Sequence, residues 1–97
     1  MLAYERIVTI DPFDAAAHSA YGRLAADRRD LTLALREFKA AIAAGPVDPV
    51  PAHCDLSETL LAAGQRAEAK QAVLAALEIA PTYERAQQLL LRIVEGR

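Results

Sequence analysis

The chain has 97 residues and a net charge of −2, and 54% of its residues are apolar, 22 of them alanine. This length allows one small domain, and the abundance of alanine, the best helix former, predicts an all-α fold. The acidic balance without a basic patch excludes an obvious nucleic-acid surface. No apolar run approaches the roughly 20 residues that span a bilayer. The single cysteine, Cys54, excludes an internal disulfide and favours a cytoplasmic location.

Helical periodicity and helix-ending residues predict six helices along the chain. Their ranges are roughly 2–10, 15–28, 31–44, 51–63, 66–79 and 83–95. Asp14, Asp30 and Thr82 stand where an N-cap side chain accepts the first amide hydrogens of a helix. Gly45 and Gly64 stand where a left-handed residue ends one.

Each helix carries one stripe of apolar or small residues at the spacing i, i+3, i+4, i+7, which predicts one buried face. The stripes of helices 15–28 and 51–63 are His18, Tyr21, Gly22, Ala25 and His53, Leu56, Ser57, Leu60. Those of helices 31–44 and 66–79 are Ala34, Phe38, Ala41, Ile42 and Ala69, Val73, Ala76, Leu77. The first helix, 2–10, carries Tyr4, Ile7 and Val8 in the same register as helices 31–44 and 66–79. The last helix, 83–95, carries Gln87, Leu90, Leu91 and Val94 in the same register as helices 15–28 and 51–63.

A proline follows the first, third and fifth predicted helices, at a nearly fixed spacing. Pro12, Pro46 and Pro81 follow one another at 34 and 35 residues, and the extra residue falls in the loop PVDPVP. The chain therefore divides into a half unit at 1–12, two full units at 15–46 and 50–81, and a last helix at 82–97. Because Leu91 replaces the small residue of the earlier stripes, we expect the last helix to cap the array.

These units resemble tetratricopeptide repeats, which are helical hairpins of about 34 residues with small residues at the helix contacts and a closing proline. Gly22 matches the small residue of the family's first helix, Ala34 and Ala41 its two alanines, and Phe38 the aromatic residue between them. The resemblance implies a right-handed α-solenoid of antiparallel hairpins, about six helices long. Four positions depart from the pattern, namely His18, His53, Ala25 and Ile7.

A second helical-repeat family remains as an alternative. Pentatricopeptide repeats are also helical hairpins, with a period of 35 residues. They bind RNA, however, and the acidic balance of this chain argues against that function.

Histidine and cysteine side chains are the only candidates for a metal site. His18 and His53 occupy equivalent places in successive units, and Cys54 follows the second of them. Zinc-like ligand spacing is absent, and Cys54 is rotated by about 100° from His53 on a helix, so partly buried structural histidines are the favoured interpretation. We found no catalytic arrangement or phosphate loop, and expect neither a cofactor nor an enzyme.

In tetratricopeptide proteins the first helices line a concave groove that holds a peptide or a partner's helix. The polar residues turned away from the predicted packing stripes are Ser19, Arg23 and Asp27, then Cys54, Asp55 and Glu58, then Arg85, Gln88 and Arg92, with Leu89 beside the last three. The resemblance therefore implies a non-catalytic protein–protein interaction scaffold with these residues in its groove. The alternative for the groove is that its charges pair with one another and bind nothing.

A structural role is the alternative function. The half unit at 1–12 lacks its first helix, so Tyr4 and Ile7 could pack against another copy of the chain or against a larger protein of which this chain is a terminal appendage. Self-assembly through this end would make the chain a homo-oligomer.

Overall fold

The computed structural model describes residues 14–96, and every regular element in this range is an α-helix. The predicted all-α fold class is therefore confirmed. The chain forms two compact units, Met1–Val47 and Asp48–Arg97. The predicted helix at 2–10, with Tyr4 and Ile7, lies outside the described residues.

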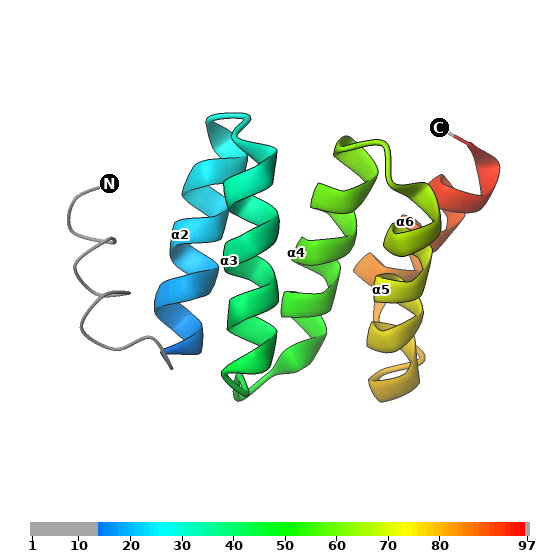
Figure 1. Cartoon of the computed structure of the whole chain (residues 1–97). Coiled ribbons are helices and arrows are strands. Elements are labelled where there is room, and N and C mark those ends of the chain that lie inside the picture. The colour runs from blue at the N-terminus through cyan, green and yellow to red at the C-terminus, as the bar shows by residue number, and fades with distance from the viewer. Residues whose placement is uncertain (1–13, 97) are drawn as a thin grey trace. The chain divides into compact units, whose positions relative to one another are not determined.

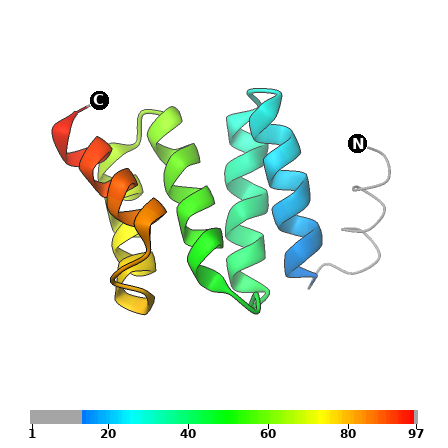
Figure 2. The same cartoon turned by 180° about the vertical axis from the view of Figure 1, so that it is seen from behind.

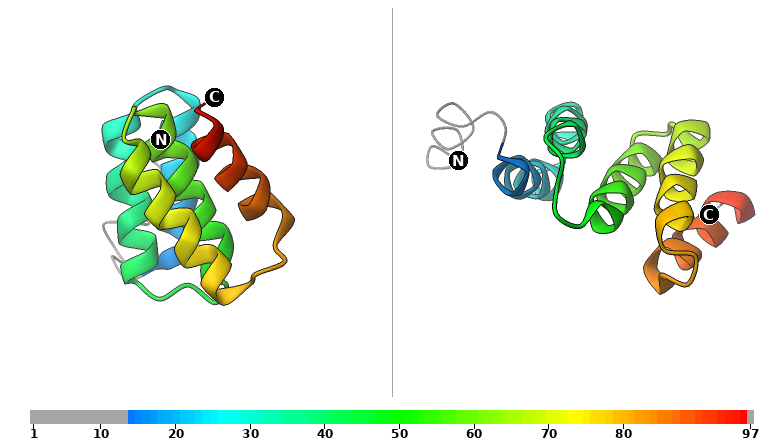
Figure 3. Two further views of the ribbon diagram at one scale, coloured as in Figure 1. Left: turned by 90° about the vertical axis from the view of Figure 1, so that its right-hand side faces the viewer. Right: turned by 90° about the horizontal axis from the view of Figure 1, so that it is seen from below.

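The first unit contains a hairpin of two helices, α2 (Ala15–Asp27) and α3 (Leu31–Ala43), which run antiparallel side by side (Figures 1 and 3). Both predicted N-caps are confirmed. Asp14 Oδ1 accepts from the amide of Ala17 at 3.0 Å, and Asp30 Oδ1 accepts from the amide of Leu33 at 3.2 Å. These bonds satisfy amides that no helical carbonyl can reach, and so define where each helix begins.

The predicted stripes form the core of this hairpin. The buried apolar residues include Tyr21, Ala25, Ala34, Phe38 and Ala41. Gly22 is the point of closest approach, because a methyl group there would lie 2.7 Å from Cε1 of Phe38. The aromatic ring of α3 therefore occupies the space that any larger residue on α2 would need.

The second unit contains α4 (Pro49–Ala62), α5 (Arg66–Ile79) and α6 (Glu84–Glu95). Helix α4 begins two residues earlier than predicted, because Asp48 Oδ1 accepts from the amide of Val50 at 3.2 Å. Gly64 has the expected left-handed conformation, with φ of 81°, and turns the chain from α4 into α5. Helices α4 and α5 pack as α2 and α3 do within their own unit, and α6 lies against both (Figures 2 and 3).

Small residues hold α4 and α5 together. Ser57, at the position equivalent to Gly22, is fully buried, and its hydroxyl donates to the carbonyl oxygen of Ala69 at 2.7 Å. Ala69, Val73 and Ala76 of α5 are 0% exposed. The predicted stripes of α4 and α5 are therefore at their helix contact.

The predicted register of α6 is wrong. Its buried residues are Ala86, Leu89 and Ile93, whereas Leu91 and Val94 of the predicted stripe are exposed. The predicted stripe corresponds to the face by which α4 contacts α5. Helix α6 packs on α4 and α5 with its opposite face, so Leu91 and Val94 are exposed. The predicted cap at Thr82 is also wrong, because Tyr83 precedes the first helical residue and no side chain caps α6.

Substitution of the buried alanines by leucine tests the helix contacts. Ala41 and Ala76 are both 0% exposed, so Ala41→Leu or Ala76→Leu should lower the free energy of unfolding by about 1–3 kcal/mol through overpacking. Chemical denaturation followed by circular dichroism measures this loss. Lys70→Ala, at an exposed position of α5, is the control and should leave the midpoint unchanged. Leucine variants that unfold like the parent would contradict the packing described here.

Candidate functional site

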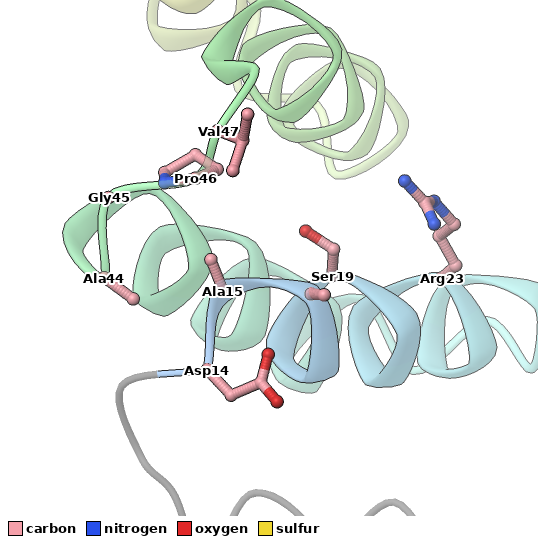
Figure 4. Close-up of a pocket in the computed structure, with 9 residues that line it drawn as sticks. Asp14, Ala15, Ser19, Arg23, Ala44, Gly45, Pro46 and Val47 are labelled. Carbon is pink, nitrogen blue, oxygen red and sulfur yellow. The ribbon is translucent and has the colours of Figure 1, made fainter.

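A hollow in the first unit lies between α2 and the turn that follows α3. It measures about 550 Å³ and is lined by residues from the start and middle of α2 and from the turn after α3, namely Asp14, Ala15, Ala16, Ser19, Arg23, Ala44, Gly45, Pro46 and Val47. Ser19 and Arg23 project from the same side of α2, one turn apart, and Val47 extends from the turn (Figure 4). The structure therefore brings two of the predicted groove residues, Ser19 and Arg23, into one hollow.

The lining combines an apolar end with a polar side. Val47 is fully exposed, and Pro46 beside it is half-buried, so the turn presents apolar surface to solvent. Ser19 is half-buried and Arg23 is exposed. The carboxylate of Asp14 caps α2. Asp27, also predicted for the groove, is exposed at the end of α2 and is not among the lining residues.

An ion-pair cluster joins α4 to α6 in the second unit. Arg85 Nη2 donates to Asp55 Oδ1 at 2.7 Å and to Glu58 Oε1 at 2.8 Å. Burial acts to lower the pKa of Arg85, but the hydrogen bonds to Glu58 and Asp55 outweigh it and raise the pKa above its ordinary value. These three predicted groove residues are thus engaged with one another.

The prediction that Cys54, Asp55 and Leu89 point away from the packed faces is wrong. Cys54 and Leu89 are buried almost completely, and the side chain of Asp55 is 9% exposed. Burial raises the pKa of the Cys54 thiol, which favours its neutral form. Two further predicted residues, Gln88 and Arg92, are exposed on α6.

A buried pair of polar residues crosses the first hairpin. His18 Nδ1 lies 3.0 Å from Glu37 Oε1, and the two residues are 5% and 4% exposed. Arg36, whose side chain lies at the surface, donates from Nε to Glu37 Oε2 at a distance of 3.3 Å. His18 is therefore a buried histidine held by a carboxylate, whereas His53 of the second unit is half-buried.

Sequence reasoning missed Glu37, although a signal was present. Glu37 occupies the i+3 place between Ala34 and Phe38, inside the stripe of α3. Its equivalent in α5, Ala72, is buried as well. A charged residue on a buried stripe needs a partner, and the histidine on the facing stripe is the residue able to supply one.

No family model and no curated protein matches the chain. The interpretation of the site therefore depends on its own geometry.

The described residues hold no group of three or more metal-ligating side chains placed to share an ion. Over the same range, none of the helices has the length and apolarity that a bilayer crossing requires. Neither finding adds a candidate site to the hollow beside α2 and the cluster around Arg85.

Proposed function

We propose that the chain is a non-catalytic scaffold built from repeats similar to tetratricopeptide repeats, stacked as a right-handed solenoid, and that it binds a segment of a partner protein. The equivalence of the two hairpins supports the repeat. Gly22 and Ser57 lie at the same place on their first helices, each against the second helix of its own hairpin. Thirty-five residues separate them, as they separate Phe38 from Val73.

The binding site that we propose is the hollow beside α2. The observation that carries this proposal is that Ser19 and Arg23 line it together with the exposed Val47. A guanidinium group next to apolar surface suits a peptide with a carboxylate close to an apolar side chain, because the charge orients the ligand while the apolar contact contributes affinity. The ligand would be an extended segment rather than a small molecule, since the lining runs along α2 from Asp14 to Arg23.

The second unit contributes less to this site. The positive charge of Arg85 is directed to Asp55 and Glu58, so a ligand carboxylate would have to compete with both. Gln88 and Arg92 are exposed, and they remain the predicted groove residues of α6 that a partner could contact. We assign recognition mainly to the first unit because the hollow lies there.

Charge reversal at Arg23 tests this function. Pull-downs from the native host would compare the parent chain with Arg23→Glu and with the control Lys39→Glu. Both variants replace a positive charge by a negative one, so they change the net charge equally. Lys39 is exposed on α3 of the same unit but is absent from the hollow lining, so only Arg23→Glu alters the proposed site. We expect partners captured by the parent and by Lys39→Glu to be lost by Arg23→Glu, with at least a tenfold fall in affinity, which corresponds to about 1.4 kcal/mol.

Equal capture by all three proteins would refute the hollow as the binding site. Equal losses in both variants would point to a dependence on net charge rather than on this surface. Circular dichroism of each variant shows that the helices are retained, so a loss of binding is not a loss of fold.

A further inference from the structure

Helix α6 presents apolar side chains to solvent on one face. Leu91 is 57% exposed and Val94 is 58% exposed, and they lie on the side opposite to the buried Leu89 and Ile93. Leu90 is half-buried at the edge of the same face. We call the set Leu90, Leu91 and Val94 the α6 face.

The repeat register shows what kind of contact this face would make. Leu91 is equivalent to Gly22 and Ser57, and Val94 is equivalent to Ala25 and Leu60. In the hairpins those four residues are buried, and the helix that follows in each hairpin packs on them. The α6 face is therefore that of a first helix, and within residues 14–96 no second helix follows it.

Residues 1–12 of the chain carry the complementary pattern. Tyr4, Ile7 and Val8 precede Pro12 by the distances that separate Phe38, Ala41 and Ile42 from Pro46. We propose that residues 1–12 of a second copy pack on the α6 face in the place of a second helix, so that copies associate head to tail. This proposal rests on the repeat register of the proposed function, but not on peptide binding in the hollow.

The sizes of the side chains set the strength of this contact. Leu91 replaces a glycine or serine, which is the change from which the sequence predicts a cap, and Ile7 replaces the alanine found at Ala41 and Ala76. Packing of a second copy on Leu91 would mean that α6 does not end the array. Both sides are larger than in the hairpins, so the two helices would sit toward the wide end of the usual separation of about 8–10 Å. One such helix pair buries less than the roughly 800 Å² per partner of a stable interface. The association is therefore weak and depends on concentration.

A head-to-tail contact uses two different surfaces, which gives it a distinctive signature in mixing experiments. Leu91→Glu removes the α6 face but keeps residues 1–12, whereas the double variant Tyr4→Asp/Ile7→Asp does the reverse. Each variant alone should stay monomeric. An equal mixture of the two should form dimers and nothing larger, because one intact joint is possible in each pair.

Sedimentation velocity from 10 μM to 1 mM measures these masses. We expect the mass of the parent to rise with concentration beyond that of a dimer. Ile79→Glu is the control, because Ile79 is 53% exposed on α5 outside the α6 face, and this variant should associate like the parent. Arg23→Glu should also associate like the parent, so failure of peptide binding and failure of assembly are distinguishable.

Three outcomes would overturn the proposal. A parent that is monomeric at 1 mM has no such contact, and a Leu91→Glu variant that associates like the parent uses another surface. Self-association of the Tyr4→Asp/Ile7→Asp variant would indicate pairing of two α6 faces instead.

A synthetic peptide of residues 1–13 gives a second measurement that does not require the N-terminal variants to fold. Added to the ¹⁵N-labelled Tyr4→Asp/Ile7→Asp variant or, should that variant be unfolded, to dilute parent chain, it should shift the amide resonances of Leu91 and Val94. The same titration of Leu91→Glu should produce no such shift. Unshifted α6 resonances at millimolar peptide would overturn the proposal.

Discussion

Replacement of Glu37 by alanine is expected to lower the free energy of unfolding by about 3 kcal/mol. This value is the upper end of the cost of an unsatisfied buried hydrogen-bonding group and the lower end of the cost of breaking a buried ion pair. Glu37 Oε1 lies 3.0 Å from His18 Nδ1 and both residues are buried. Alanine leaves the imidazole inside the hairpin without this carboxylate, and a desolvated polar group is costly. Native-state hydrogen exchange of the α2 and α3 amides measures the loss in the unit where it arises.

Replacing both partners distinguishes a polar requirement from a packing requirement. The double variant His18→Leu/Glu37→Leu removes both polar groups at similar volume, and should recover most of the stability lost in Glu37→Ala. Arg36→Ala is the control for the surface partner of Glu37, because the Arg36 side chain is 71% exposed and its ion pair contributes little. A double variant no more stable than Glu37→Ala would show that the shape of the pair matters more than its polarity.

The helices of the described region were predictable because local signals determine them. The observed bounds differ from the predicted ones by no more than two residues, and Asp14, Asp30 and Gly64 act at the helix ends as expected. Caps and periodicity involve residues at most one or two turns apart, so they can be read without knowledge of the tertiary structure. Thr82 failed as a cap because α6 begins one residue further on than predicted.

Contacts made by a third helix were not predictable in the same way. One apolar stripe identifies one buried face, but α4 touches both α5 and α6. Cys54 and Asp55 are therefore buried although they lie off the stripe, and Leu89 is buried where a solvent-facing residue was predicted. The pairing of Arg85 with Asp55 bridges 30 residues of sequence, and no local pattern specifies it.

The prediction missed Glu37 for a different reason. Its position lies on the stripe of α3, but the search considered apolar and small residues and Glu37 is charged. A search for apolar residues at helical spacing passes over an acid at the i+3 place. Asking which charged residues fall on buried stripes would have paired Glu37 with His18, because both are polar departures on facing stripes of one hairpin. For the candidate site, the resemblance to tetratricopeptide repeats together with helical geometry predicted Ser19 and Arg23, whereas the contribution of Pro46 and Val47 depended on the course of the turn.

The contact of Gly22 with Phe38 yields the second large effect. Gly22→Ser is expected to lower the free energy of unfolding by about 1–3 kcal/mol, because the added Cβ would lie 2.7 Å from a ring that is 2% exposed and has little room to move. Phe38→Val should cost about 3 kcal/mol through the cavity that it leaves. Chemical denaturation of each variant measures these losses.

The double variant Gly22→Ser/Phe38→Val recreates in the first hairpin the pair that the second hairpin already uses, Ser57 with Val73. There, the serine hydroxyl donates to the carbonyl oxygen of Ala69, and the equivalent carbonyl in the first hairpin belongs to Ala34. The valine makes room for the serine, and the serine fills part of the cavity, so the double variant should be more stable than the sum of the single losses by about 1–2 kcal/mol. Strict additivity would mean that the two hairpins do not share one packing solution, and the structural equivalence that supports a repeat would fail at its closest contact.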